Sequence, residues 1–323
     1  MLLPKDVYLQ MAGNNRKLAA LVLLFPIALS AFVYFFLIAF QFLYNEGSET
    51  EYYEAMMTMN ARDIFYLLLP LILLISVLII LFSFFRGQNL ILHMAGAELC
   101  PEDKEHLPIY HAVENVALAA GLPTPRVYLI KDSALNAFAT GYSPKDASIT
   151  LTTGLVEKLS PLELQSVIAH EMGHILNRDI RLNLFIITGI GIIGLMGEML
   201  IRGTRHRGRS SGSRGKGAQI GLILMAVGFA LYLFRYLVAP FIHMAVSRTQ
   251  EFQADATSAY LTRNPRALAD ALAKIASFPT VVSLADTKEF SSMCIFSPLE
   301  NISHLLDTHP PIKDRIERLE QMM

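Results

Sequence analysis

The segment SPLELQSVIAHEMGHILNRD, residues 160–179, determines what the rest of the chain has to build around it. A Ser160 cap, a proline in the first turn and Glu163 three residues after the cap are typical of a helix start. On such a helix His170 and His174 are four residues apart and therefore share one face. Both imidazoles can then reach one ion, so the pattern His-Glu-x-x-His predicts a zinc site.

Glu171 gives the predicted zinc site a possible catalytic role. It lies about 100° around the helix from the first histidine, beside an ion that both histidines hold. Zinc lowers the pKa of a bound water from about 15.7 to about 7, and a neighbouring carboxylate can then take the proton. We therefore expect a peptidase with Glu171 as its general base. The competing interpretation is a helix that carries ordinary polar residues.

The composition is that of a membrane protein. Of the 323 residues 53% are hydrophobic, and the mean hydropathy of +0.41 is too high for an ordinary soluble domain. Four apolar segments have about the length of 20 residues that a helix needs to cross a bilayer. No proline or glycine lies between Gly173 and Gly189, so we expect the motif helix to continue directly into the third segment. The four segments are residues 18–44, 64–85, 184–201 and 219–246.

The charges beside these segments predict the orientation. Lys5, Arg16 and Lys17 precede the first segment, whereas the loop after it is acidic. The positive-inside rule then places the N-terminus and the polar region after the second segment in the cytoplasm. The basic loop at residues 202–217 breaks this rule if the third and fourth segments both cross. Either the loop is an exception or the two segments form a hairpin that does not fully traverse the membrane.

Other classes of protein are disfavoured by charge and cysteine content. The formal net charge of −1 offers no electrostatic basis for nucleic acid as a partner. Cys100 and Cys294 are too few for a disulfide framework and do not have the spacing of a zinc site. We interpret them as small apolar residues in a reducing compartment.

The polar regions contain short predicted elements. The strand candidates alternate with Gly, Pro and Asp turns, and the last two are expected to pair antiparallel. A helix ending at Gly121 precedes them, and two more helices follow the fourth segment. The predicted strands are residues 127–130, 137–140 and 149–152, and the predicted helices are residues 108–120, 265–276 and 312–320.

Two histidines need a third protein ligand. A metzincin is excluded because Asn177 and Ile180 stand where that class has glycine and histidine. We choose Glu251, which follows the apolar hairpin by a few residues and so returns to the membrane face that carries the motif. Asp255, one turn later, could accept the second ring proton of a ligand histidine. Glu198 is a weaker candidate, at the wrong end of the third segment.

Together these motifs resemble those of the HtpX membrane metalloproteases, gluzincins related to the CAAX-prenyl endopeptidases. The resemblance covers nearly the whole chain, from two spans through the soluble domain and hairpin to a His-Pro tail. It implies that His170, His174 and Glu251 bind one Zn²⁺ per chain. It also implies that Glu171 is the general base and that Asp255 orients a histidine ligand.

The resemblance further assigns residues outside the metal motifs. Asn136, Ala137 and Phe138 match a strand edge on which the substrate is bound as an additional strand. His309 matches a histidine that stabilises the oxyanion, and Arg315 matches a residue that braces this region. A histidine before a Pro-Pro turn without chemistry is the alternative for His309.

We therefore expect a mainly α-helical integral membrane protein with a small α+β cytosolic zinc-metallopeptidase domain and four hydrophobic segments. A two-span anchor is predicted at residues 1–86 and a soluble part with the motif at residues 87–183. An apolar hairpin at residues 184–246 and the rest of the protease domain, with the third ligand, at residues 247–323 complete the predicted division.

The resemblance implies an endopeptidase of proteolytic quality control and stress response. It would cleave damaged or misfolded membrane proteins, or unfolded polypeptides, at the lipid bilayer of the bacterial cytoplasmic (inner) membrane, with the protease domain facing the cytoplasm. Cleavage specificity and oligomeric state cannot be inferred. One alternative is a CAAX-prenyl-type peptidase, although the chain has few spans for one. Another is a non-catalytic zinc-binding scaffold or chaperone, although structural zinc needs four protein ligands and no fourth is evident.

Overall fold

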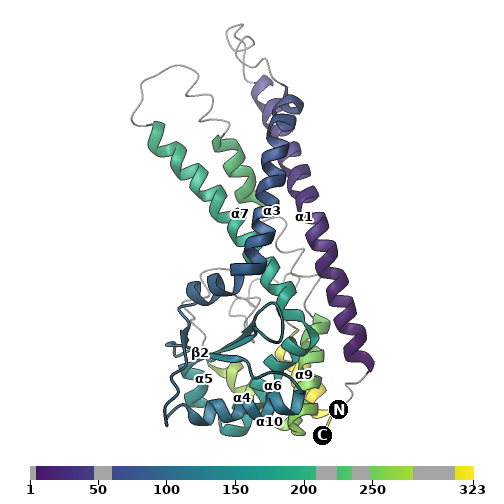
Figure 1. Cartoon of the computed structure of the whole chain (residues 1–323), viewed down its shortest axis with the longest axis vertical. Coiled ribbons are helices and arrows are strands. Elements are labelled where there is room, and N and C mark those ends of the chain that lie inside the picture. Colours follow the sequence, from purple (N-terminus) through teal and green to yellow (C-terminus); the bar gives the residue numbers. More distant parts are fainter. Residues whose placement is uncertain (1–4, 47–59, 209–223, 235–247, 279–309) are drawn as a thin grey trace. The chain divides into compact units, whose positions relative to one another are not determined.

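The computed structural model describes residues 5–46, 60–208, 224–234, 248–278 and 310–323. The described residues form two compact units, and Figure 1 labels many of their elements. Each unit is assembled from segments that are far apart in the sequence. The sheet-containing unit is drawn from residues 1–18, 84–187 and 241–323, and the helical unit is drawn from residues 19–83 and 188–240.

Helices dominate the described part of the chain. They are α1 (Lys5–Glu46), α3 (Ala61–Met94), α4 (Leu107–Ala120), α5 (Thr153–Lys158), α6 (Pro161–Asn177), α7 (Asp179–Gly208), α9 (Arg248–Thr262), α10 (Pro265–Ser277) and α12 (Ile312–Glu320). The strands are β1 (Glu98–Leu99), β2 (Arg126–Ile130), β3 (Ala137–Thr140) and β4 (Ser148–Thr152). This mainly helical architecture with one small sheet confirms the predicted fold class.

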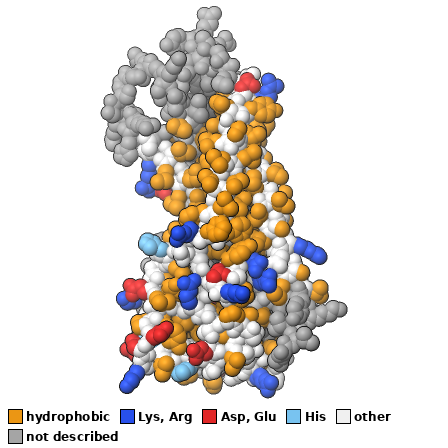
Figure 2. All heavy atoms as spheres, in the orientation of Figure 1, with side chains coloured by type: hydrophobic (Ala, Val, Ile, Leu, Met, Phe, Trp, Pro, Cys, Tyr) orange, Lys and Arg blue, Asp and Glu red, His pale blue; other side chains and the backbone are white. Residues whose placement is uncertain are grey.

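Three described helices are long and apolar enough to cross a membrane: Leu9–Ala39 within α1, Ala61–Met94, and Asp179–Gly203 within α7. The fourth predicted segment is represented by a shorter apolar helix, Leu224–Phe234. Figure 2 shows an extended apolar surface along the long helices. Such a surface suits lipid rather than water. The most exposed large apolar side chains of α1 and α3 include Leu23, Phe35, Leu67 and Phe85.

In the helical unit α7 and the helix Leu224–Phe234 are packed closely because two glycines let their backbones approach. A Cβ atom on Gly197 would lie 2.8 Å from the Gly228 oxygen, and one on Gly228 would lie 3.0 Å from the Gly197 oxygen. Small residues at such crossings are typical of helix pairs in lipid. Phe234 also meets the ring of Phe32 on α1 edge-on, with ring centroids 5.3 Å apart.

The sheet has the strand order β1-β2-β4-β3. The predicted antiparallel pairing of β3 with β4 is confirmed, with Ala137 opposite Leu151 and Ala139 opposite Ile149. The sequence analysis did not predict β1, which has two residues, or the parallel pairing of β2 with β4. β3 therefore forms one edge of the sheet, and α6 packs against it.

The helix α6 begins as predicted. The backbone N–H of Glu163 donates to the Ser160 hydroxyl, and the Ser160 N–H donates to the Glu163 carboxylate at 2.7 Å. Val167, Ile168 and Met172 are fully buried in a core shared with the sheet, α4 and α10. Each such side chain contributes roughly 1.5–3 kcal/mol. The core therefore holds the motif on a rigid element.

The motif helix does not continue into the third span, which corrects the expectation from the sequence. α6 ends at Asn177, Arg178 has the left-handed backbone conformation with φ 62°, and α7 begins at Asp179. Residues other than glycine adopt this conformation rarely, so the sequence carries no marker of the break. The break changes the direction in which the Asp179 side chain points.

The Glu163 carboxylate makes the stability of this fold pH-dependent. It lies 2.7 Å from the Lys274 ammonium on α10. Burial alone would raise the pKa of Glu163, but the hydrogen bonds from Lys274 and the Ser160 N–H outweigh it and lower the pKa. A lowered folded-state pKa means that the stabilisation is present above the ordinary pKa and is lost as the pH falls through the folded-state value.

We expect Glu163→Gln to lower the free energy of unfolding by up to about 1 kcal/mol at neutral pH, because Lys274 is partly exposed to solvent. The difference from the wild type should disappear in acid, as followed by thermal unfolding in detergent. Lys274→Met should reproduce part of the neutral-pH loss. A difference that stays constant with pH would contradict this account.

Candidate active site

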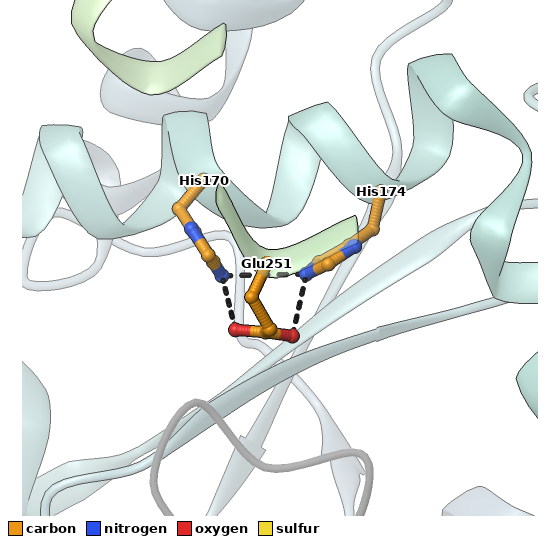
Figure 3. Close-up of side chains that lie close together, drawn as sticks. All are labelled: His170, His174 and Glu251. Atoms are coloured by element: carbon orange, nitrogen blue, oxygen red, sulfur yellow. Dashed lines mark hydrogen bonds and ion pairs between the residues drawn. The ribbon is translucent and has the colours of Figure 1, made fainter. Parts of the chain in front are cut away.

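The helix α6 presents His170 and His174 on one face (Figure 3). Their ring centroids are 4.9 Å apart and their Nε2 atoms are 3.3 Å apart. The His170 side chain is 1% exposed and that of His174 is 12% exposed. Both Nε2 atoms thus face the same small space beside the helix.

Glu251, in the first turn of α9, faces the same space. Its Oε2 lies 3.7 Å from the Nε2 of His170, and its Oε1 lies 3.6 Å from the Nε2 of His174 (Figure 3). The two helices approach so closely because α6 has a glycine at the contact. A Cβ atom on Gly173 would lie only 3.1 Å from the Cα of Ala254. Gly173, one of the two unspecified positions of His-Glu-x-x-His, therefore allows the short distance between α6 and α9.

A carboxylate orients each imidazole through its other nitrogen. His170 Nδ1 lies 2.9 Å from an oxygen of Asp255, and His174 Nδ1 lies 3.1 Å from an oxygen of Asp179. An ionised carboxylate only accepts hydrogen bonds, so the ring proton belongs on Nδ1. Each Nε2 then carries a lone pair. With both imidazoles neutral, two lone pairs and the Glu251 carboxylate face one another, an arrangement that a proton on one Nε2 or a metal ion between the groups stabilises.

The surroundings favour positive charge at this point. Burial alone would lower the pKa of His174, but the hydrogen bond to Asp179 and the negative charge of Glu251 raise it to about 9. A bound metal ion would supply positive charge at the same point. Histidines that bind a metal have to be unprotonated at the ligand nitrogen.

The distances also fit a metal ion. Two ligand atoms about 2.0–2.1 Å from a tetrahedral zinc lie about 3.4 Å apart. The two Nε2 atoms are 3.3 Å apart, and one oxygen of Glu251 lies 3.7 Å from that of His170 while the other lies 3.6 Å from that of His174. With one ligand atom from each residue, all three atoms lie within 4.8 Å of one another. Among the described residues these three form the group that can hold a metal, which leaves a fourth position for water or substrate.

Glu171 lies on the same helix and is 2% exposed. Burial raises the pKa of Glu171 and the charge of Glu251 adds to this effect, whereas the two imidazoles oppose it. The backbone N–H of Ala139 on β3 donates a hydrogen bond to Glu171 and also lowers its pKa. The carboxylate is therefore placed between the motif helix and the outer strand of the sheet.

Arg315 on α12 is a fully buried cation. Its guanidinium donates to both oxygens of Asp255, at 2.7 and 2.9 Å, and its Nη1 lies 3.2 Å from an oxygen of Glu251. Burial alone would raise the pKa of Asp255, but the charge of Arg315 and the hydrogen bond with His170 outweigh it and lower the pKa. Arg315 thus ties α12 to Glu251 and to Asp255, the hydrogen-bond partner of His170.

The sequence analysis did not identify Asp179 as the partner of His174. An acidic residue five positions after the second histidine was visible in the sequence. In an unbroken helix, however, it would point about 140° away around the axis. The left-handed Arg178 turns α7 so that the Asp179 carboxylate reaches the imidazole.

The other predicted site residues are placed as follows. Asn136 directly precedes β3, which begins at Ala137, and Phe138 is buried in the same strand. His309 lies outside the described residues. Glu198, the weaker ligand candidate, pairs with an arginine one turn along α7 and is not part of the group.

Fold and site together define a class of protein. Two histidines from one helix, a glutamate from a later helix, a buried carboxylate beside them and a sheet edge are the parts of a gluzincin-type metallopeptidase. Long apolar helices add a membrane anchor to it.

Comparison with known proteins identifies the family. Residues 103–323 match the family described as "Peptidase family M48", and the chain belongs to this family. A protein named "Protease HtpX homolog" from Caldanaerobacter subterraneus is 35% identical over 322 residues, which are 98% of each chain. The homolog of that name from Bacteroides fragilis strain YCH46 is 33% identical over 321 residues, 97% of each chain.

A further homolog of the same name, from Leuconostoc citreum, is 39% identical over 233 residues, 71% of this chain and 75% of its own. Among solved structures, the crystal structure of S. mikatae Ste24p matches with 19% identity and a TM-score of 0.42, over 98% of this chain and 67% of that chain. The family and the apolar helices make this protein a multi-pass membrane metalloprotease that acts on peptide substrates.

The buried pair of Arg315 and Asp255 predicts a large effect on stability. Arg315→Met leaves a buried carboxylate without its cation, and loss of one partner of such a pair costs about 3–5 kcal/mol. Arg318→Met is a matched control, because Arg318 lies on the same helix at an exposed position over the ring of Phe252. It should cost about 1 kcal/mol or less. Equal losses in urea or thermal unfolding would show that Arg315 does not brace the site.

Proposed function

We propose that His170, His174 and Glu251 hold one zinc ion per chain and that the protein is a zinc-dependent endopeptidase. The observation that carries this proposal is the convergence of the two Nε2 atoms and the Glu251 carboxylate, with one ligand atom of each residue within 4.8 Å of the others. Bound zinc would polarise the scissile carbonyl and lower the pKa of a water molecule.

In this proposal Glu171 is the general base. It takes the proton of the attacking water and delivers it to the leaving amine. Two features support this role: the carboxylate adjoins the ligand histidines, and burial raises its pKa toward the range in which a base both accepts and returns a proton. The N–H of Ala139 restrains its orientation.

Three further residues complete the proposed machinery. Asp255 orients His170, and Arg315 holds Asp255. His309 stabilises the oxyanion, a role that rests on the sequence resemblance and on its place six residues before Arg315. Donors to an oxyanion contribute a factor on the order of 10² or more.

We propose that the substrate is bound along β3 as an additional strand, at Asn136, Ala137 and Phe138. The Thr152 N–H donates to the Asn136 oxygen, so this pair is hydrogen-bonded across the strands. Pairs alternate in an antiparallel ladder, and Ala137 and Ala139 therefore direct their backbone groups to the free edge. Since Ala139 reaches Glu171, a peptide on this edge would pass the base. Backbone pairing tolerates many side chains, which suits varied substrates.

We further propose that the substrates are damaged or misfolded membrane proteins and other unfolded polypeptides. The cell location proposed is the bacterial cytoplasmic (inner) membrane, with the protease domain facing the cytoplasm. Support comes from the bacterial sources of the HtpX protease homologs, from the apolar helices, and from Arg16 and Lys17, which lie near the N-terminal end of the first long helix and directly before its apolar run.

Two substitutions separate catalysis from metal binding. Glu171→Gln should keep zinc and the fold but lower the rate of casein cleavage by at least about 10²-fold, because the base is lost. Glu251→Ala should lose zinc as well, since two histidines alone hold it weakly. Elemental analysis of purified protein in detergent gives the zinc content.

Glu198→Ala is the control for these variants, because this partly exposed carboxylate lies on α7 and, among the described residues, forms its ion pair with Arg202 of the same helix. It should retain both zinc and activity. Substantial casein cleavage by Glu171→Gln would falsify its assignment as base. Full zinc content in Glu251→Ala would exclude that residue as a ligand.

The proposed substrate strand is tested with proline. Ala137→Pro removes an edge-facing N–H, which donates to the Asn136 side-chain oxygen at 2.9 Å, and adds a ring on the edge, while the hydrogen bonds between β3 and β4 remain. We expect KM for an unstructured peptide substrate to rise about tenfold or more, with kcat and zinc content much less affected.

Leu99→Pro is the matched control on the opposite edge. The Cys100 N–H donates to the Val127 oxygen, so by alternation the Leu99 N–H points away from β2 in the same manner. This variant should keep the wild-type KM. A similar rise in KM for both variants would mean that the effect comes from the sheet as a whole and that β3 is not the docking edge.

A further inference from the structure

Asn14 is a buried polar residue near the start of the first long apolar helix, and it is 3% exposed. In the sequence it belongs to a short polar group, Asn14–Lys17, that precedes an apolar run and has no evident partner. In the structure, the part of α1 up to Leu18 belongs to the unit that also contains the candidate metal ligands. Asn14 therefore belongs to the same compact unit as the candidate metal ligands, although it is far from them in the sequence.

The Asn14 amide binds three other segments at once. Its Nδ2 donates to the backbone oxygen of Asn177 at 3.0 Å and to Oδ1 of Asp179. Its Oδ1 accepts a hydrogen bond from Nε2 of Gln250 at 3.1 Å. Both the donor and the acceptor group of the amide are thus used, in a place closed to solvent.

Each of these partners adjoins a candidate metal ligand. Asn177 is the last residue of α6, the helix that carries both histidines. Asp179 uses its other oxygen for His174 Nδ1, at 3.1 Å. Gln250 directly precedes Glu251 in α9. Asn14 is therefore linked to His174 through the Asp179 side chain, which it contacts by a hydrogen bond. It is linked to Glu251 through Gln250, the preceding residue in the chain.

The break after α6 explains why such a link is needed. The left-handed Arg178 leaves the end of α6 and the start of α7 joined by a single residue. Carbonyl groups in the last turn of a helix have no partner within the helix. The Asn14 amide supplies one for Asn177 and fixes the neighbouring Asp179 carboxylate in the same contact.

We propose that Asn14 is a positioning residue of the metal site: it holds the Asp179 carboxylate against His174 and keeps the start of α9 in register with the end of α6. The first membrane helix is then part of the site's framework as well as an anchor. This inference rests on the proposed metal site. It predicts that metal affinity depends on a side chain that touches no ligand.

The test compares Asn14→Leu with Asn15→Leu in the full-length protein in detergent micelles. Asn15 is the matched control, because it has the same side chain on the same helix turn. Its Oδ1 accepts a hydrogen bond from Arg181 instead, at 3.1 Å, outside the chain of contacts to His174. The zinc dissociation constant is measured by competition with a chromophoric chelator, and the visible absorption of bound Co²⁺ reports the ligand geometry.

We expect Asn14→Leu to weaken zinc binding about tenfold, the lower end of the effect of losing a group that orients a metal ligand. The Co²⁺ spectrum should change in shape, and Asn15→Leu should match the wild type in both measurements. An Asn14→Leu protein with wild-type zinc affinity and an unchanged Co²⁺ spectrum overturns the proposal. If this variant does not fold, Asn14→Gln, which keeps the amide but displaces it, is measured with the same expectation.

A double-mutant cycle separates positioning from general destabilisation. If Asn14 acts through Asp179, then Asn14→Leu should change the zinc affinity less than about twofold when Asp179→Ala is already present. An equal loss in both backgrounds would mean that Asn14 acts by some other route, which also overturns the proposal.

The outcome for the proposed function is read separately. Wild-type protein that binds no zinc, or a Glu251→Ala variant that binds it normally, contradicts the metal site itself. Wild-type zinc binding that depends on Glu251 but not on Asn14 contradicts the positioning role alone.

Discussion

The arrangement of this protein depends on one unfavourable interaction, the close approach of two imidazole lone pairs and a carboxylate. The three groups lie within 3.3–3.7 Å of one another, at a point where His170 is 1% and Glu251 is 6% exposed. Burial of such groups is costly unless positive charge lies beside them, and Arg315, whose Nη1 lies 3.2 Å from an oxygen of Glu251, supplies part of that charge. A cation at this point turns the same arrangement into a stable one, which is why the geometry indicates a metal site.

The neighbouring charges are arranged in alternation to support it. Arg315 is positive, Asp255 is negative, and Asp255 in turn holds the proton-bearing nitrogen of His170. On the other side Asp179 does the same for His174. Each carboxylate therefore serves two groups, and removing any one cation or acid leaves a buried partner without compensation. Glu171 is buried beside these groups. Burial and the charge of Glu251 raise its pKa, whereas the two histidines lower it.

Membrane anchoring and the metal site are also built from the same helices. α1 and α7 each have one end in the sheet-containing unit and continue into the helical unit. The end of α1 that carries Asn14 and the end of α7 that carries Asp179 are hydrogen-bonded to each other. The close contact of α6 with α9 at Gly173 comes from backbone packing in the core. The geometry of the candidate metal site thus follows from how these helices are packed within the sheet-containing unit.

The sequence by itself determined the local parts: the capped motif helix, the pairing of β3 with β4, the long apolar helices and the helix Ile312–Glu320. It also indicated Glu251, since a ligand has to return to the same membrane face. The local parts depend on periodicity and on neighbours a few residues away. The tertiary structure alone decided the left-handed Arg178, the contact of Asp179 with His174 and the role of Asn14 as a link. Such contacts join residues up to 236 positions apart, and packing selects them rather than local propensity.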